Sequence, residues 1–288
     1  MTKSLHPLKA YRDPDFINSA AARSVRLLSE YLSPYRRFRQ EKVRDTIVFF
    51  GSARAIPRQK AEEIYLERLN SELETINPTA SEQVEVAKIQ LEIGRYYDDA
   101  VELSRLLTAW SLSLAKNSNH FVICSGGGPG IMEAANLGAH LAGGKSIGLN
   151  ISLPMEQLPN PYITESLNFD FHYFFMRKYW FVYLAKALIV FPGGFGTMDE
   201  LWELLTLIQT GKITKKMVVL LYGRKYWNEV INFKAMVRWG TISSEDLEIF
   251  QFADTPPEAF EIVKAGLEKY YVRPNRHERP AKKPDVRL

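Results

Sequence analysis

Two glycine-rich turns, each directly behind an apolar run, constrain this chain more than any other feature. Residues 121–133 read FVICSGGGPGIME and residues 187–200 read ALIVFPGGFGTMDE, so each stretch predicts a strand, a glycine turn and the start of a helix. Such a unit aims unpaired backbone N–H groups and the positive end of a helix dipole at one point, which makes an anion site. The second turn ends in the carboxylate of Glu200, so the pair indicates a nucleotide phosphate held beside a reactive acid.

Strands alternate with helical segments along most of the chain, which is typical of an α/β fold. The predicted strands are the apolar runs at 46–50, 121–124, 145–150, 188–191 and 217–222. This rhythm predicts a Rossmann-like, doubly wound parallel sheet with helices on both faces. Ligands of such sheets bind at the carboxyl ends of the strands, where Gly51, Gly126 and Gly193 are expected.

The predicted organisation has three parts. Residues 1–45 form an N-terminal helical extension, in which Ser33-Pro34 is expected to end the helix and the basic residues 36–44 to form a solvated face. Residues 46–272 form the Rossmann-like nucleotide-binding domain, with a helical insertion of two helices at 57–92. Residues 273–288 form a basic tail that is expected to be disordered.

Composition narrows the class of protein and of partner. The net charge of +4 comes entirely from the tail, which holds six basic and two acidic residues, and the rest of the chain is neutral. Because the tail is expected to be a disordered terminus and the folded part carries no excess of basic residues, no nucleic-acid partner is expected. Cys124 is the single cysteine, which excludes an intrachain disulfide. No apolar run approaches the ~20 residues of a membrane span, and the first residues lack the apolar stretch of a signal peptide. A cytoplasmic protein without a membrane partner is therefore expected.

Two common phosphate motifs do not fit the glycine turns. The dinucleotide fingerprint needs a third glycine or alanine where Ile131 stands, and the alternative frame places Glu133 against the pyrophosphate. The P-loop needs a glycine at the position of Ala139, five residues before Gly144-Lys145-Ser146, and that segment precedes a strand instead of following one.

Four blocks of sequence instead resemble one known family. Residues 192–200 match the signature P-G-G-x-G-T-x-x-E of the Lonely guy (LOG) family, and residues 126–136 match its other glycine block. Residues 50–54 resemble its first-strand turn and residues 176–178 its arginine motif, although the His that often precedes the Arg is missing. The family includes cytokinin riboside 5′-monophosphate phosphoribohydrolases, and many members carry the older label "lysine decarboxylase-like".

The resemblance implies an activity and an assembly. The expected reaction is hydrolysis of the N-glycosidic bond of a nucleoside 5′-monophosphate, AMP or a modified AMP, to free base and ribose 5-phosphate, as in cytokinin biosynthesis. The expected assembly is a homodimer or a higher homo-oligomer, and no metal or organic cofactor is expected. A non-catalytic nucleotide or molybdenum-cofactor carrier of the same fold is the alternative. The decarboxylase label has no support in the residues, because a lysine alone is no Schiff-base site.

The motifs also assign the site. Catalysis is expected from Arg177 and Glu200. Substrate binding is expected from Gly51, Ser52, Arg54, Gly127, Gly128, Glu133, Met176, Lys178, Gly193, Gly194, Gly196 and Thr197.

Several of these residues also have structural interpretations. Thr197-x-x-Glu200 has the spacing of a helix capping box, which needs no ligand. Arg177 fits a structural ion pair or a stack on an aromatic ring. Lys178 fits a solvated surface, and Glu133 fits a helix cap.

Overall fold

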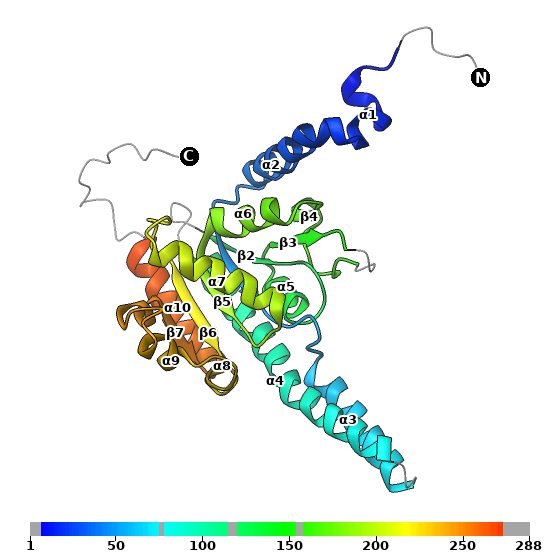
Figure 1. The fold of residues 1–288 in the computed structure, drawn as a ribbon, viewed down its shortest axis with the longest axis vertical. Coiled ribbons are helices and arrows are strands. Elements are labelled where there is room, and N and C mark those ends of the chain that lie inside the picture. The colour runs from blue at the N-terminus through cyan, green and yellow to red at the C-terminus, as the bar shows by residue number, and fades with distance from the viewer. Residues whose placement is uncertain (1–6, 75–77, 115–119, 154–157, 273–288) are drawn as a thin grey trace.

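The computed structural model describes residues 7–74, 78–114, 120–153 and 158–272, and these residues form a seven-stranded parallel sheet (Figure 1). The strands are β1 (Asp45–Phe50), β2 (Phe121–Ser125), β3 (Ser146–Ile151), β4 (Asn168–Phe171), β5 (Ala185–Val190), β6 (Val218–Tyr222) and β7 (Phe250–Ala253). Their order in the sheet is β4-β3-β2-β1-β5-β6-β7. The predicted doubly wound parallel sheet is confirmed.

This strand order places a crevice beside β1. The first strand, β1, lies in the middle of the sheet; β2 to β4 then follow on one side of it, and β5 to β7 on the other. The direction of winding therefore reverses between β1 and β5, and ligands bind at such a reversal. The turns after these two strands meet there, because the Ser52 amide donates to the Pro192 carbonyl over 2.9 Å.

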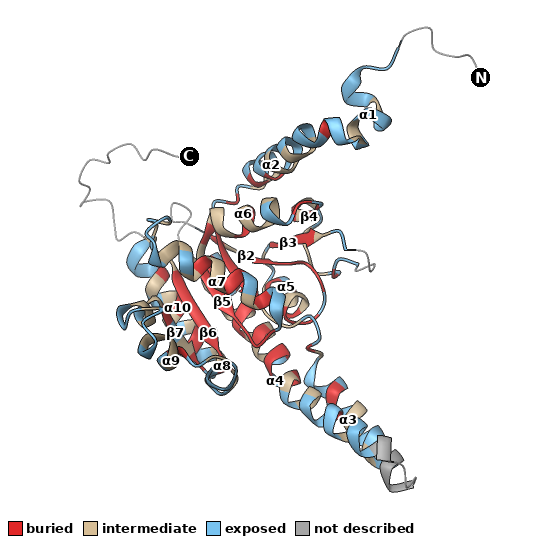
Figure 2. Ribbon diagram, in the orientation of Figure 1, coloured by how far each residue is buried: buried red, intermediate tan, exposed pale blue. Residues whose placement is uncertain are grey.

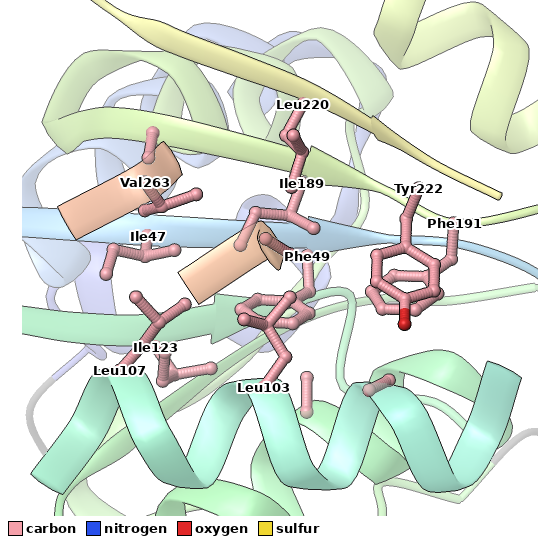
Figure 3. Packing of buried hydrophobic residues seen from close by; sticks show 14 of the residues in the cluster. Ile47, Phe49, Leu103, Leu107, Ile123, Ile189, Phe191, Leu220, Tyr222 and Val263 are labelled. Carbon is pink, nitrogen blue, oxygen red and sulfur yellow. The ribbon is translucent and has the colours of Figure 1, made fainter. Parts of the chain in front are cut away.

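Helices cover both faces of the sheet, and the alternation of side chains along β1 shows how the two cores divide. Ile47 and Phe49 pack against the helices on one face of the sheet, together with Leu103 of that helix layer (Figure 3). Val48 and Phe50 pack into the opposite core. The first layer consists of α4 (Pro78–Ser113), α5 (Ile131–Leu141) and α10 (Pro256–Tyr270). The second consists of α2 (Arg23–Gln40), α6 (Phe174–Leu184), α7 (Phe195–Gln209), α8 (Arg224–Val230) and α9 (Phe233–Arg238).

The strands β4 and β7 are absent from the sequence-based expectation. Each has four residues and lies at an edge of the sheet, where only one side of the backbone pairs with a strand of the described residues. An edge strand tolerates alternating polar side chains, and four residues are too few to produce a clear period.

The two helices expected at 57–92 are present, but the second does not end there. α3 (Arg58–Glu74) is followed by α4, which continues through residue 92 to Ser113. One helix therefore begins in the projecting arm of Figure 1 and ends against the sheet. Figure 2 shows mostly exposed residues along the arm and buried residues where α4 reaches the sheet.

The expectation that Ser33-Pro34 ends the N-terminal helix is wrong. After the short helix α1 (Pro14–Asn18), α2 runs through Pro34 to Gln40. A proline inside a helix leaves the carbonyl four residues earlier without its N–H partner, here that of Glu30. The Trp180 indole N–H of α6 donates to this carbonyl over 3.0 Å. The tertiary contact replaces the missing helical bond.

The basic stretch after Pro34 is not wholly solvated either. The Arg37 guanidinium donates to the carbonyls of Ser166 and Asn168 at 2.8 Å each and lies 4.1 Å from the centre of the Phe169 ring. Residues 273–288, the expected basic tail, lie outside the described residues, and the division into domains stays a prediction. None of the helices in the described ranges is long and apolar enough to cross a membrane.

Candidate functional site

A cavity of about 1290 Å³ opens at the carboxyl ends of β1 and β5. The turn after β1 lines it with Gly51, Ser52 and Arg54, and the turn after β5 with residues 192–197. Further walls come from α4, α6, α7 and α8. The cavity therefore occupies the crevice that the strand order predicts.

The second glycine turn presents the free N-terminus of α7 to this cavity. The helix begins at Phe195, and its first internal bond runs from the Met198 amide to the Gly194 carbonyl over 3.0 Å. The amides of Phe195, Gly196 and Thr197 precede that bond, so the helix itself provides them with no acceptor. With the helix dipole, they form an anion site on the cavity wall.

The three glycines of this turn differ in what surrounds them. A Cβ at Gly193 would collide with the Thr197 hydroxyl, so packing requires glycine there. A Cβ at Gly194 or Gly196 would meet no atom of the described residues within 4 Å, and neither residue has a positive φ. Both line the cavity. Packing among the described residues therefore does not require glycine at these two positions, and their backbone is open to close approach from the cavity.

Glu200 lies in the second turn of α7, buried to 6% exposure, on the wall of the same cavity. The capping-box interpretation is wrong, because α7 begins two residues before Thr197 and its N-cap is Gly194. The Glu200 carboxylate lies 4.0 Å from Arg177 Nη2 and 3.8 Å from Lys178 Nζ. Burial raises its pKa to about 7, although both cations act to lower it. This carboxyl group exchanges its proton near neutral pH.

Arg177 reaches the cavity from α6. Its guanidinium lies 5.3 Å from the Phe174 ring centre and 5.5 Å from that of Phe181, and burial lowers its pKa. Its buried Nε has no hydrogen-bond partner within the described part of the chain. A buried unpaired donor is costly, so a ligand that accepts from it gains affinity. Arg177 thus combines the predicted aromatic stack with an available N–H.

The side chain of Lys178 forms ion pairs within the protein instead of lining the cavity as a substrate-binding residue would. It pairs with Asp199 at 2.8 Å and with Glu203 at 2.7 Å. Burial opposes its charge, but these hydrogen bonds outweigh that effect and raise its pKa. Lys178 is missing from the cavity wall that the described residues form, and so is Met176, which packs against the buried core.

The first glycine turn has a different role from the second. The Gly127 amide donates to Ser125 Oγ over 3.1 Å, and the Gly127 carbonyl accepts from the Asn160 amide over 2.8 Å. At the helix start, the Ile131 amide donates to the Ser52 carbonyl over 3.0 Å. These groups already have protein partners, so the turn joins β2 to the β1 turn and offers fewer free amides to an anion.

Only part of this first block reaches the cavity in the described structure. Gly128 lines it, whereas Gly127 and Glu133 do not. Glu133 instead accepts a hydrogen bond from the Tyr97 hydroxyl of α4 over 2.9 Å. The structure therefore brings together ten of the fourteen expected site residues on one wall system: Gly51, Ser52, Arg54, Gly128, Arg177, Gly193, Gly194, Gly196, Thr197 and Glu200.

Sequence reasoning missed Tyr226. This side chain lines the cavity from α8, and its hydroxyl donates to the Gly193 carbonyl over 2.7 Å, which fixes the second glycine turn. Its position just after the predicted strand at 217–222 was the available signal, since residues after a parallel strand face the site. In the described residues no group of three or more His, Cys, Asp or Glu side chains is arranged to hold a metal ion.

Comparisons with known proteins agree with the sequence motifs. A family profile described as "Possible lysine decarboxylase" matches residues 132–263. A cytokinin riboside 5′-monophosphate phosphoribohydrolase of Arabidopsis thaliana is 32% identical over 181 residues, which cover 61% of this chain and 75% of the relative. A probable enzyme of the same name from Oryza sativa subsp. japonica is 30% identical over 181 residues, covering 61% of this chain and 66% of the relative.

Solved structures resemble the fold more distantly. The molybdenum cofactor carrier protein of Chlamydomonas reinhardtii aligns with a TM-score of 0.42 and 21% identity, over 61% of this chain and 89% of that chain. The molybdenum cofactor binding protein of Rippkaea orientalis aligns with a TM-score of 0.43 and 19% identity, over 59% and 86% of the two chains.

Proposed function

Because the chain belongs to the Lonely guy family of cytokinin riboside 5′-monophosphate phosphoribohydrolases, we propose that it hydrolyses the N-glycosidic bond of a nucleoside 5′-monophosphate. The substrate is AMP or a modified AMP, and the products are the free base and ribose 5-phosphate. One observation carries the proposal: the open N-terminus of α7 shares a cavity with the buried pair Arg177 and Glu200.

The phosphate binds first in this scheme. The amides of Phe195, Gly196 and Thr197 receive it, and the open space over Gly194 and Gly196 lets it approach the backbone. Holding the phosphate fixes the sugar relative to Glu200, which lies one turn further along the same helix. Such positioning lowers the entropic part of the barrier.

Glu200 and Arg177 then perform the chemical step. As the C1′–N bond breaks, positive charge develops on the ribose, and the ionised Glu200 carboxylate stabilises it. The same carboxylate accepts a proton from the attacking water, whose oxygen bonds to C1′ as the C1′–N bond breaks. The departing base takes up a proton from solvent at the released nitrogen, and Glu200 returns the proton of the water to solvent at the end of the cycle. Arg177 acts to lower the pKa of this carboxyl group, which favours its ionised form against the larger effect of burial, and donates its free Nε–H to the substrate.

A comparison of AMP, N6-isopentenyl-AMP and adenosine tests this function. Release of free base is measured with the purified full chain, and kcat/KM for a nucleotide is expected to exceed that for adenosine by about 100-fold or more, because phosphate binding positions the sugar. Equal kcat/KM for nucleotide and nucleoside would overturn the phosphate-anchored scheme. Tight binding of all three compounds without base release would identify a carrier instead.

We also propose that the protein acts in the cytoplasm as a homodimer or a higher homo-oligomer, as the sequence resemblance implies. Light scattering on the eluted peak of a gel-filtration column measures the mass, and a mass of 33.0 kDa, that of one chain, would refute the assembly.

A further inference from the structure

The helix that carries Arg177 is capped by a residue from a different segment of the chain. α6 begins at Phe174, and its N-cap residue Tyr173 makes no side-chain capping bond within the described structure. The carboxylate of Glu30, on α2, lies at that end instead. We propose that Glu30 is a positioning residue that holds Arg177 in its working place against Glu200, an inference that rests on the proposed function.

The contact has the geometry of a helix cap made from outside the helix. Glu30 Oε1 accepts from the His172 amide at 2.9 Å, and Oε2 accepts from the Tyr173 amide at 3.3 Å. Both amides lie at the N-terminal end of α6, where a negative charge also interacts favourably with the helix dipole. One carboxylate therefore satisfies two backbone donors and fixes the start of the helix.

The cap is connected to Arg177 through a single residue. The Tyr173 amide donates to Glu30, and the Tyr173 carbonyl accepts from the Arg177 amide over 3.2 Å. A shift of Tyr173 therefore moves the first turn of α6, and Arg177 with it.

Glu30 holds α6 at a second point as well. Its carbonyl, left free by Pro34, accepts the indole N–H of Trp180 at 3.0 Å. Trp180 follows Arg177 by three residues, so the two side chains lie on neighbouring parts of the helix surface. Two contacts from one residue, at the start and in the middle of α6, fix both the position of the helix end and the rotation of the helix about its axis.

Neighbouring packing keeps α2 in place for this task. The buried Phe38 ring of α2 has its centre 5.0 Å from that of Phe169 and 5.2 Å from that of Trp180. The Tyr31 ring centre lies 5.7 Å from those of both Tyr179 and Trp180. In Figure 1, α2 passes directly beside α6. The family profile matches residues 132–263, which contain α6 but not α2, so the N-terminal extension supplies this cap from outside the matched region.

The test compares Glu30→Ala and Glu30→Gln with Glu41→Gln. Glu41 is a matched control, since it is a carboxylate at the C-terminal end of the same helix and pairs with Lys145 at 2.7 Å, away from α6. Glutamine retains one acceptor oxygen, so Glu30→Gln keeps half of the cap and also serves if Glu30→Ala does not fold. The measurements are kcat and KM for AMP well below the melting temperature, and hydrogen exchange of the His172, Tyr173 and Arg177 amides.

We expect kcat to fall about tenfold or more in Glu30→Ala and less in Glu30→Gln, because a small misplacement of a reacting group lowers the rate strongly. In the control Glu41→Gln, kcat should fall by less than about twofold. We expect KM to change less than kcat, because three α7 amides bind the phosphate whereas Arg177 adds one donor to the substrate. An unchanged kcat in the folded Glu30 variants, whatever their melting temperature, would show a purely structural cap and overturn the proposal. If the parent protein releases no base, the proposed function fails separately. Hydrogen exchange then decides, and unchanged protection of the Arg177 amide in Glu30→Ala would overturn the positioning role.

Discussion

Replacing Glu200 with glutamine is expected to move activity and stability in opposite directions. The change keeps the shape of the side chain and removes its charge. The folded protein keeps Glu200 at 6% exposure, beside Arg177 and Lys178 but without a contact shorter than 3.8 Å to either cation. Burial of the charge therefore outweighs the two attractions, and the pKa rises from 4.5 to about 7.

The raised pKa sets the size and the sign of the stability change. A folded-state pKa above the unfolded value means that the folded protein holds this proton more tightly than the unfolded chain does. The favourable contribution of this proton to the free energy of folding is therefore complete below pH 4.5 and is lost as the pH rises to about 7. At 1.36 kcal/mol per pKa unit, the ionised side chain costs about 3 kcal/mol of folding free energy at pH 8. Glutamine does not carry this cost.

Glu200→Gln is therefore expected to melt about 6 °C higher than the parent at pH 8, taking about 2 °C per kcal/mol for a chain of this length. The difference should shrink to about 2 °C near pH 5 and disappear only below pH 4.5, where the parent carboxyl is protonated in both the folded and the unfolded state. Turnover of AMP at pH 8 should fall by about 100-fold or more, because an amide neither accepts the proton of water nor stabilises a cation as a carboxylate does.

The assay is a pair of measurements on each protein, thermal unfolding from pH 5 to pH 8 and release of adenine at pH 8. Glu203→Gln is the control, because Glu203 is on the same helix and pairs with Lys178, but its side chain is 37% exposed and lies off the cavity wall of the described residues. It should change the melting temperature by less than about 1 °C, as expected of a partly exposed ion pair. A melting temperature of Glu200→Gln that is lower than the parent at pH 8 would refute the reasoning, because it would mean that the ion pairs outweigh burial.

Three further predictions concern the same wall of the cavity. In the parent, kcat/KM is expected to rise with pH near pH 7 as Glu200 ionises. Lys178→Met removes a charge that lowers the Glu200 pKa, so this rise should move to higher pH. An unmoved profile would mean that Lys178 does not act on Glu200. Arg177→Lys should lose most of the activity despite the retained charge, because lysine lacks the planar fork, and steady-state kinetics showing near-parent kcat would contradict this. Gly194→Ala should leave the melting temperature within about 1 °C of the parent and weaken binding of ribose 5-phosphate. Gly193→Ala should instead lower the melting temperature, because its Cβ collides with Thr197. Differential scanning calorimetry measures the first quantity and titration calorimetry the second.

The sequence was most informative where long apolar runs and glycine turns occur together. β1, β2, β3, β5 and β6 are buried runs of five or six residues, and the expected strand positions agree with them to within about three residues. The short edge strands β4 and β7 depend on pairing with a neighbour rather than on their own pattern, and they were missed. The helix α2 was cut at Pro34 in the prediction, because its continuation depends on Trp180, a residue that lies far away in the sequence.

Local patterns also failed where they had two structural meanings. The spacing of Thr197 and Glu200 is the same in a capping box and in the second turn of a helix that starts earlier. What decides between them is the glycine at 194, which lets α7 begin at Phe195 and places Glu200 one turn inside the helix. The sequence does contain this information, but only the backbone path shows which residue is the N-cap. The role of Lys178 likewise depends on Asp199 and Glu203, which reach it from another helix.

The two glycine turns lead to a general point about anion sites in parallel sheets. Their sequences predict the same strand, turn and helix start, yet the amides of the first turn bind Ser125 and the Ser52 carbonyl, whereas the α7 amides open onto the cavity. Both turns follow a strand that neighbours β1, and both bond to the β1 turn. The first does so through the Ile131 amide at its helix start, whereas the second uses the Pro192 carbonyl and leaves the α7 amides unused. A free helix N-terminus is therefore not a property of the glycine motif alone, since the atoms that bond to the neighbouring turn decide which amides remain available. Of these two turns, the second leaves a free helix N-terminus beside the buried Glu200. In the proposed reaction, the same helix, α7, therefore holds both the phosphate and the carboxylate that acts on the sugar.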